Sequence, residues 1–325
     1  MHGYIVRYLR VIAFAVAFGG LLAGTPFIGA ARAAEPTSIW IDTDAACGSS
    51  ALADAGDCWA LALALRSPGV VVRGISSVTG TIKAGQAALL VAEVAKRFGY
   101  AGEIHQGAVR KNYRPTAASR AIAAALKKER LTIVALGPLT NVAAVLLTQP
   151  KLVPQIAGIV TVFGTPPEIT EVDYLTDHRN YNAVADTKAV AALLRAEVEV
   201  VVIPIDAGRG AMLTHAHLDV VAGGTERAQW LAGLSRGWVN TWRERIREAG
   251  AFPADSVAVA YATHPNLFTC TKTLGEFAWK HSFFSEKSAL RIGDNIEGGR
   301  PITYCGAIKP EFRDALIQAI AGGGN

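Results

Sequence analysis

The sequence predicts an α/β protein built on one open, mostly parallel, Rossmann-like sheet with helices on both faces. Runs of residues that are apolar throughout alternate with segments of helical periodicity, which is typical of strands that are buried on both faces and joined by helices. Polar residues and glycines come directly after these apolar runs. Right-handed crossovers bring the ends of parallel strands to one edge of a sheet, where ligands bind. We therefore expect a functional site at that edge.

The expected elements alternate along the chain. We predict strands at 39–41, 70–78, 131–136, 159–163 and 198–205, with helices at 59–65, 87–98, 142–147 and around 190–194. The residues that would follow these strands are Asp42, Asp44, Thr79, Gly137, Gly164 and Asp206.

A long amphipathic helix is expected at 226–250. Trp238 and Trp242 are four residues apart in it, so they share one face of the helix. Such a pair usually packs in the core. The alternative is a wall on which a ring-shaped ligand stacks, and this makes Trp242 a candidate substrate-binding residue.

The N-terminal segment has the order of a secretory signal. Two arginines precede an apolar run at 11–30, and Ala31-Arg32-Ala33 follows it. We expect cleavage after Ala33, export to the periplasm or the medium, and one domain at 34–325 without a stable membrane span. An uncleaved anchor is the alternative, because the run approaches the roughly 20 residues that span a bilayer.

The charge of the chain does not indicate nucleic acid as a partner. Residues 1–33 contain three arginines and no acidic residue, so their removal lowers the formal charge from +5 to +2. No basic run remains in the mature chain.

The chain has four cysteines, an even number in a compartment where disulfides persist. Four cysteines allow three pairings. We expect Cys47 to pair with Cys58 and Cys270 with Cys305, while free buried thiols remain the alternative.

Four carboxylates are concentrated near the predicted sheet edge, at Asp42, Asp44, Asp54 and Asp57. Such a cluster is costly unless a cation neutralises it or some of the carboxyls are protonated. Carboxylate oxygens suit calcium or magnesium, whereas zinc normally recruits His or Cys. Ordinary helix capping by aspartate is the alternative. His215 and His217 could also be read as metal ligands, although a loop or a helix start explains them equally well.

Several motifs occur in an order known from one enzyme family. They are Asp42-Thr43-Asp44, the run Asp54-Ala55-Gly56-Asp57-Cys58-Trp59-Ala60-Leu61, Arg66-Ser67-Pro68, Val78-Thr79-Gly80, Ala135-Leu136-Gly137-Pro138-Leu139-Thr140-Asn141, Asn180-Tyr181-Asn182 with Ala185-Asp186, and Asp255-Ser256-Val257-Ala258-Val259-Ala260-Tyr261. Together they resemble the inosine-uridine preferring nucleoside hydrolases over nearly the whole mature chain.

This resemblance implies the nucleoside hydrolase fold and a calcium (Ca2+) site. Asp44 would be both a calcium ligand and the general base, and Asp57, the Leu136 carbonyl and Asp255 would complete the protein ligands. Calcium-activated water would then cleave the N-glycosidic bond of a small, nucleoside-like substrate, as in purine and pyrimidine salvage. Members of the family are commonly homo-oligomers.

The substrate contacts depart from the family pattern. Asn182 matches a ribose-binding position, but Gly56, Thr81, Asn180 and Ala254 stand where the family usually has Asp, Asn, an acidic residue and His. Asp54, two residues before Gly56, is the candidate replacement for the missing carboxylate. The expected substrate-binding set is therefore Asn182, Asn180, Asp54, Thr81 and Trp242.

Two functions follow from this pattern of residues. The first is an N-glycosidase, in which Arg243, Arg247, Tyr261 or a water would assist the leaving group in place of Ala254. The second is a non-catalytic periplasmic protein that binds calcium and a ligand and has kept the fold. The presence of Asp44 favours the first.

Overall fold

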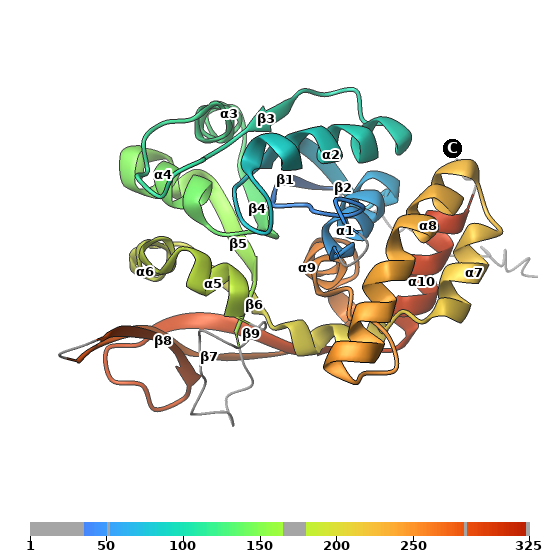
Figure 1. The fold of residues 1–325 in the computed structure, drawn as a ribbon. Helices are drawn as coiled ribbons and strands as arrows, with labels where there is room; N and C mark the ends of the chain where they lie inside the picture. Colours follow the sequence, from blue (N-terminus) through green and yellow to red (C-terminus); the bar gives the residue numbers. More distant parts are fainter. Residues whose placement is uncertain (1–35, 51–52, 165–179, 283–284, 323–325) are drawn as a thin grey trace, which may run out of the picture. The chain divides into compact units, whose positions relative to one another are not determined.

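Nine strands form one sheet in the order β3-β2-β1-β4-β5-β6-β9-β7-β8 (Figure 1). The computed structural model describes residues 36–50, 53–164, 180–282 and 285–322, with the backbone alone at 278–282 and 285–289. The strands are β1 (Thr37–Thr43), β2 (Val70–Ser77), β3 (Ile104–Gln106), β4 (Leu131–Ala135), β5 (Ile156–Val162), β6 (Val200–Ile203), β7 (Phe268–Ser282), β8 (Ser285–Gly293) and β9 (Arg300–Ile308).

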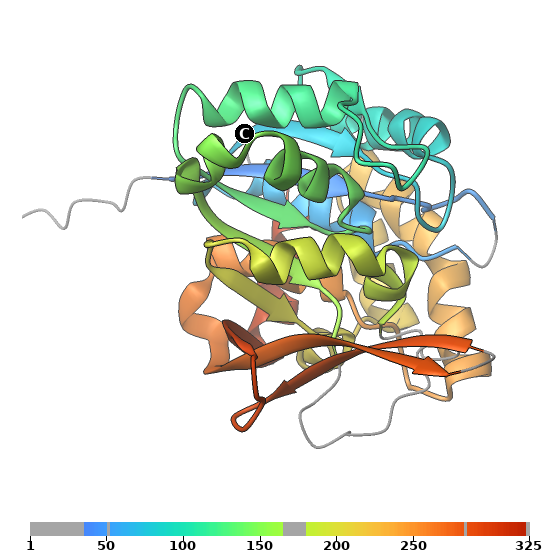
Figure 2. The ribbon, with the colours of Figure 1, turned by 90° about the vertical axis from the view of Figure 1, so that its left-hand side faces the viewer.

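The sheet is mostly parallel, as predicted. Strands β1 to β6 pair in parallel, and β9 extends the parallel part beside β6. Strand β7 pairs antiparallel with both β8 and β9, and these strands form the long ribbon in Figure 2. The sequence reading did not place this antiparallel part, because the chain after 263 lacks the alternation of apolar strand and amphipathic helix.

Helices cover both faces of the sheet, each over its own core (Figure 1). One core is formed with α1 (Gly56–Arg66), α2 (Ala84–Arg97), α7 (His215–Ala222), α8 (Glu226–Thr241), α9 (Ala254–Thr263) and α10 (Glu311–Ala321). The other is formed with α3 (Ala117–Leu126), α4 (Thr140–Thr148), α5 (Tyr181–Ala185) and α6 (Thr187–Arg195). The predicted strands and helices as far as 205 are present with shifted ends.

The helix predicted at 226–250 is shorter than expected. The α-helix α8 ends at Thr241, and a π-helical turn follows at Trp242–Ile246. Arg247 then adopts a left-handed backbone conformation with φ of 66°, which ends the regular hydrogen-bond ladder. The end of the α-helix could not be predicted from the sequence, since the apolar periodicity continues through this turn.

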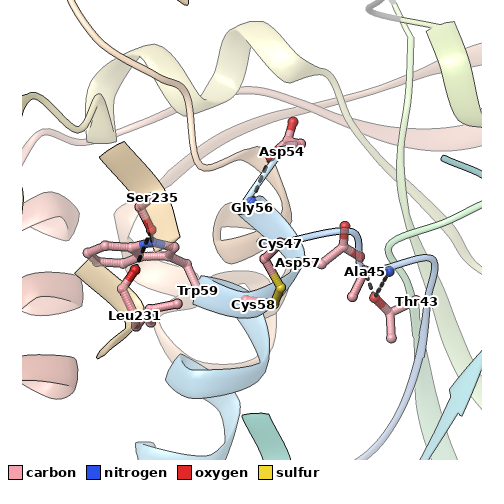
Figure 3. Close-up of a disulfide and its surroundings, with 10 residues drawn as sticks. All are labelled: Thr43, Ala45, Cys47, Asp54, Gly56, Asp57, Cys58, Trp59, Leu231 and Ser235. Atoms are coloured by element: carbon pink, nitrogen blue, oxygen red, sulfur yellow. Dashed lines mark hydrogen bonds between the residues drawn. A yellow bond between two sulfur atoms is a disulfide. The ribbon is translucent and has the colours of Figure 1, made fainter. Parts of the chain in front are cut away.

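Both predicted disulfides are present, Cys47–Cys58 and Cys270–Cys305. The first joins the loop after β1 to the first turn of α1 (Figure 3). The second links β7 to β9 within the antiparallel part of the sheet. The alternative of free buried thiols is therefore wrong.

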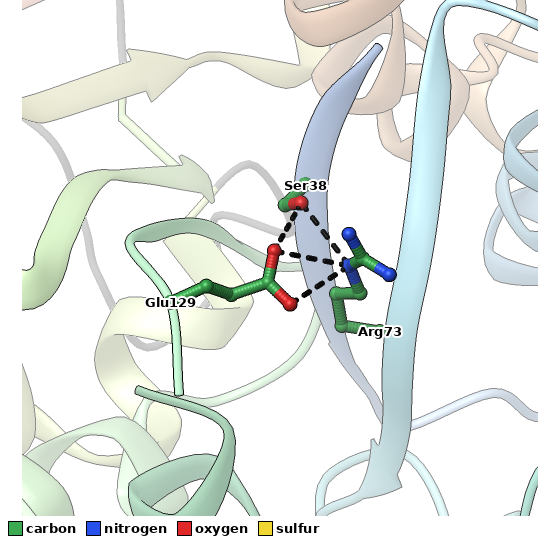
Figure 4. A network of polar contacts seen from close by, with 3 residues as sticks. All are labelled: Ser38, Arg73 and Glu129. Carbon is green, nitrogen blue, oxygen red and sulfur yellow. Dashed lines mark hydrogen bonds and ion pairs between the residues drawn. The ribbon is translucent and has the colours of Figure 1, made fainter. Parts of the chain in front are cut away.

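A polar network fastens the sheet at the edge opposite the expected site (Figure 4). Ser38 on β1 donates to Glu129 at 2.6 Å, and Arg73 on β2 pairs with the same carboxylate at 3.0 Å. Glu129 lies just before β4, so one carboxylate ties the starts of neighbouring strands. All three groups are near solvent, where such pairs contribute little to stability.

The predicted signal at 1–33 lies outside the described residues, so cleavage and export remain predictions. In the described part, no helix is both long and apolar enough to cross a membrane.

Candidate active site

The site forms where the strand order reverses. The chain runs from β1 outward to β2 and β3, and then returns to place β4 on the other side of β1. Ligands of open α/β sheets bind in the crevice at such a switch point. Asp44 follows β1 and Leu136 follows β4, and the Leu136 N–H donates to the Asp42 carbonyl at 2.8 Å. The topology thus brings together two groups that are 92 positions apart in the sequence.

Asp44 is held between two glycines of neighbouring loops. Its side chain is 4% exposed. A Cβ at Gly137 would lie 2.7 Å from Asp44 Oδ1, and a Cβ at Gly80 would lie 2.7 Å from Asp44 Cγ. The Thr81 N–H donates to Asp44 Oδ2 at 2.8 Å. The glycines of the Val-Thr-Gly and Leu-Gly-Pro motifs therefore provide the space in which this carboxylate lies against the backbone.

Two further carboxylates come from helix N-termini. Asp57 lies in the first turn of α1 and Asp255 in the first turn of α9, and these two helices pack together in one core. A helix N-terminus favours negative charge. Asp57 also accepts a short hydrogen bond from the Thr43 hydroxyl (Figure 3). Neither α1 nor α9 has a side-chain cap hydrogen bond, so capping does not account for these two aspartates.

Burial and the repulsion of the carboxylates for one another raise the pKa values in this cluster. Burial, with hydrogen bonds from Thr81 acting against it, raises the pKa of Asp44. Burial and then the charge of Asp44 raise the pKa of Asp57 well above its usual value. The pKa of Asp255 is raised in the same way by burial and by the charges of Asp57 and Asp54. Such a group of acids is stabilised by a cation or by protonation.

No basic residue neutralises this cluster in the part of the chain that the structure describes. None of the ion pairs found there involves Asp44, Asp57 or Asp255. Among the same residues, no three His, Cys, Asp or Glu side chains converge in an arrangement that could hold a metal ion. The carboxylates are near enough for their charges to interact, and their oxygens are the ligand type that calcium takes. The donor chemistry therefore fits calcium, while the convergence of the ligands remains a prediction.

Asn182 and Asn180 lie beside this cluster on the chain between β5 and α6. The Asn182 side-chain amide donates to the Leu136 carbonyl at 2.6 Å and to the Val162 carbonyl at 3.0 Å. These two bonds use both of its N–H groups, which leaves the side-chain oxygen for another partner. Asn180 is buried, and its Oδ1 accepts from the Gly164 N–H at 3.0 Å. Asn182 thus contacts the Leu136 carbonyl, which the sequence analysis proposed as a metal ligand.

The other predicted substrate residues occupy different surroundings. Thr81 is exposed and uses its backbone N–H to hold Asp44. Asp54 is exposed in front of α1, and its Oδ1 accepts from the Gly56 N–H at 2.6 Å (Figure 3). Trp242 is 6% exposed and its ring packs on Phe252 with the centroids 4.5 Å apart. Core packing is therefore what the structure shows for Trp242.

The three proposed leaving-group residues are not equivalent in the fold. Tyr261 packs edge-on against Phe268, and the charge of Glu199 acts on it. Tyr261 lies in the last turn of α9, six residues after Asp255, and its role toward the leaving group stays a prediction. Arg243 and Arg247 are exposed in and after the π-helical turn.

The histidines that could be read as metal ligands have other partners. His217 belongs to the capping box of α7, where its Nδ1 accepts from the Thr214 N–H at 3.1 Å. His215 Nε2 lies 2.7 Å from Asn240 Oδ1. The structure thus supports the reading of these residues as part of a helix start.

The sequence pointed to Asp42 and Asn141 but not to the residues that hold them behind the site. Asp42 is buried and accepts from Ser76 at 2.6 Å and from Asn141 at 2.9 Å. Burial raises its pKa to about 7, although these hydrogen bonds act against the rise. Asn141 also accepts from the Ala108 N–H at 2.8 Å. The Asp42 and Asn141 positions in the two motifs were visible in the sequence, but their partners come from β2 and the loop after β3.

Tyr181 is a second residue that the sequence reading did not select. Its side chain is 45% exposed, and burial and the charge of Asp44 raise its pKa. Tyr181 therefore lies near the carboxylate cluster at the start of α5. Its place between Asn180 and Asn182 was the only signal that could have marked it.

The fold is that of solved nucleoside hydrolases. The plant nucleoside hydrolase PpNRh1 superposes with a TM-score of 0.72 at 17% identity, over 88% of this chain and 99% of that one. An inosine-guanosine nucleoside hydrolase superposes with a TM-score of 0.71 at 19% identity, over 88% of this chain and 98% of that one. These likenesses show the fold alone.

The sequence places the chain within a family. The profile of the inosine-uridine preferring nucleoside hydrolases matches residues 39–296, and the chain belongs to this family. A non-specific ribonucleoside hydrolase RihC of Shigella flexneri serotype 5b (strain 8401) is 30% identical over 155 residues, which are 46% of this chain and 48% of the relative. The chain thus spans about half the length of the curated relatives it matches.

Proposed function

We propose that the protein hydrolyses the N-glycosidic bond of a nucleoside or a related riboside. The observation that carries this proposal is the buried Asp44, held at the switch point beside Asp57 and Asp255 without a basic partner among the described residues. Membership of the nucleoside hydrolase family supports it. So does the similarity of about half of the chain to RihC, a non-specific ribonucleoside hydrolase.

Calcium is the cofactor that this cluster would hold. Asp44, Asp57, Asp255 and the Leu136 carbonyl would be its protein ligands, all of them oxygens. Bound calcium would relieve the mutual repulsion of the carboxylates, bind sugar hydroxyls and make a nearby water more acidic.

Asp44 would be the general base in this reaction. Its carboxylate accepts from the Thr81 N–H and is fixed against Gly80 and Gly137, so its orientation is set before substrate binds. A water at Asp44 would lose its proton to this carboxylate and attack the anomeric carbon. General-base assistance of this kind contributes about 10² to 10⁴ in rate.

The cluster would also stabilise the transition state. Cleavage at an anomeric carbon passes through an oxocarbenium-like state with positive charge on the sugar ring. Asp44, Asp57 and Asp255 supply negative charge at a preorganised position. The oxygen of Asn182, whose N–H groups are both used, would accept from a sugar hydroxyl and orient the ring.

The departing nucleobase must receive its proton from a group other than residue 254. Ala254 has no proton to donate. The candidates are Arg243, Arg247, Tyr261 and water, or a substrate with a leaving group that departs without protonation.

A second candidate is a protein that binds calcium and a riboside without turnover. Gly56 and Ala254 favour it, because neither position can supply a carboxylate or an acid to the substrate. Release of reducing sugar from a panel of nucleosides, in calcium and in chelator, separates the two. Calcium-dependent release supports the hydrolase. Binding of a nucleoside by calorimetry without any release would support the binding protein.

The setting of this reaction is also proposed from the sequence. The N-terminal signal supports export to the periplasm or the medium, and a small nucleoside-like molecule would be the partner. The family relationship supports a homo-oligomer.

A further inference from the structure

Two ties join the end of β1 to the first turn of α1, one on each side of Asp44 in the sequence (Figure 3). Before Asp44, the Thr43 hydroxyl donates a short hydrogen bond to the Asp57 carboxylate. After Asp44, the disulfide joins Cys47 to Cys58, the residue that follows Asp57. Asp44 therefore belongs to a short segment that is fastened to α1 at both ends.

The disulfide gives a shorter covalent path between two candidate metal ligands than the main chain does. Asp44 and Asp57 are 13 positions apart along the chain. Through the disulfide, the path runs three positions from Asp44 to Cys47 and one position from Cys58 to Asp57. A shorter connection has fewer conformations, so holding its ends together costs less entropy. The disulfide therefore limits how far Asp44 can move from Asp57.

The first turn of α1 is the fixed partner in this arrangement. Residues 56–64 of the helix are all buried, and the Trp59 Nε1 donates to the Ser235 hydroxyl on α8 at 2.8 Å. A Cβ at Gly56 would lie 3.4 Å from Asp255 Cγ, with Asp255 Oδ2 closer still. Gly56 thus lets the turn lie against a third candidate ligand. The segment of Asp44 is therefore fastened to an element that its own packing already holds in place.

Charge repulsion acts against this arrangement while no cation is bound. The charge of Asp44 disfavours a second charge at Asp57. The hydrogen bond from Thr43 opposes that repulsion, but one such bond contributes little net free energy. A covalent bridge resists the repulsion without adding a ligand or a charge to the cluster. The disulfide is therefore the stronger of the two ties.

We propose that Cys47 and Cys58 are positioning residues for calcium, because their disulfide holds Asp44 close to Asp57 before the metal binds. The oxidised protein then has two of its candidate ligands in place, and calcium binding does not have to order the segment of Asp44. This inference rests on the proposed calcium site and adds to it a pair of residues outside the ligand set.

The second disulfide of the chain provides a matched control. Cys270 is 15 positions from Asp255, the nearest aspartate of the cluster in sequence, and its bridge to Cys305 lies within the antiparallel part of the sheet. Calcium affinity is measured by calorimetry for the wild type, for Cys47→Ser/Cys58→Ser and for Cys270→Ser/Cys305→Ser. Each double replacement removes one disulfide and leaves neither of its thiols.

Calcium affinity separates positioning from a purely structural role. In chelator, both double variants should unfold at a lower denaturant concentration than the wild type. Only Cys47→Ser/Cys58→Ser should bind calcium more weakly, by about tenfold to a hundredfold, which is the usual cost of losing a group that holds metal ligands in place. A calcium Kd for this variant within about threefold of the wild-type value, or an equal rise in the control variant, would overturn the inference.

Thermodynamic linkage gives a second test on the wild type, in which no variant has to fold. If the disulfide strengthens calcium binding, calcium must protect the disulfide from reduction by the same factor. Dithiothreitol reduces the bridge by thiol–disulfide exchange, in which the reagent becomes its cyclic disulfide while two electrons and two protons pass to the cysteine sulfurs. Free thiols are then alkylated and identified by peptide mass analysis at equilibrium.

The two disulfides should respond differently to the metal. Saturating calcium should lower the equilibrium constant for reduction of Cys47–Cys58 by about tenfold to a hundredfold, and that for Cys270–Cys305 should change little. No change at Cys47–Cys58, or the same change at both disulfides, would contradict the positioning role.

The failures of the two proposals are distinguishable. A wild type that binds calcium and cleaves ribosides, with calcium affinity unchanged in Cys47→Ser/Cys58→Ser, overturns this inference alone. A wild type that binds no calcium overturns the proposed calcium site and this inference with it.

Discussion

The close approach of Asp44 to the backbone at Gly80 leads to a quantitative prediction. In Gly80→Ala, the new Cβ would lie 2.7 Å from Asp44 Cγ and 2.9 Å from Asp44 Cβ. Carbon atoms in contact are normally about 3.5 Å apart, so the Asp44 side chain must shift by roughly 0.8 Å. A misplacement of about 1 Å at a reacting group can cost about a hundredfold in rate. We expect kcat/KM to fall by about that factor, with a loss of about 1 to 3 kcal/mol in stability from overpacking.

The assay compares Gly80→Ala with a glycine substitution that meets nothing. Gly233 is exposed in α8, and no atom lies within 4 Å of a Cβ built there. Gly233→Ala should keep wild-type kcat/KM and raise the free energy of unfolding by about 0.5 to 1 kcal/mol, because alanine favours a helix. Both variants are checked by circular dichroism before the kinetics. If folded Gly80→Ala keeps kcat/KM within about threefold of wild type, the fixed position of Asp44 is not needed for catalysis and the assignment of the base is refuted.

Three further predictions concern charge, metal and disulfide. Asp44→Asn should lower kcat/KM by at least about a hundredfold, and activity within about tenfold of wild type would contradict the mechanism. The same variant should raise the melting temperature in chelator, because it removes a buried charge that repels its neighbours. Calcium at about 100 times its Kd should stabilise the wild type by about 2.7 kcal/mol, and equal melting temperatures in calcium and in chelator would refute the calcium site. Replacing Cys270 and Cys305 together by serine should cost about 3 to 4 kcal/mol in denaturant unfolding, since the disulfide spans 35 residues, and an unchanged midpoint would contradict the entropic reasoning.

The sequence by itself determined the parallel part of the fold and named most members of the candidate site. Apolar runs alternating with helical periodicity specify strands that are buried on both faces, and this pattern is local. The aspartates at the end of β1 and at the start of α1 could be found for the same reason, since a strand end and a helix start are both marked by neighbouring residues. The disulfide pairs were also expected from the cysteine positions.

Only the tertiary structure decided how these groups meet. The roles of Gly80 and Gly137 depend on the approach of Asp44 from another strand, and the role of Gly56 depends on Asp255, which is 199 positions later. Trp238 and Trp242 are four residues apart and share a helix face by sequence. In the structure, the Trp238 indole N–H faces Asp54, whereas the Trp242 ring packs on Phe252. Such differences arise from contacts between elements that are far apart in the chain. Local periodicity does not predict those contacts.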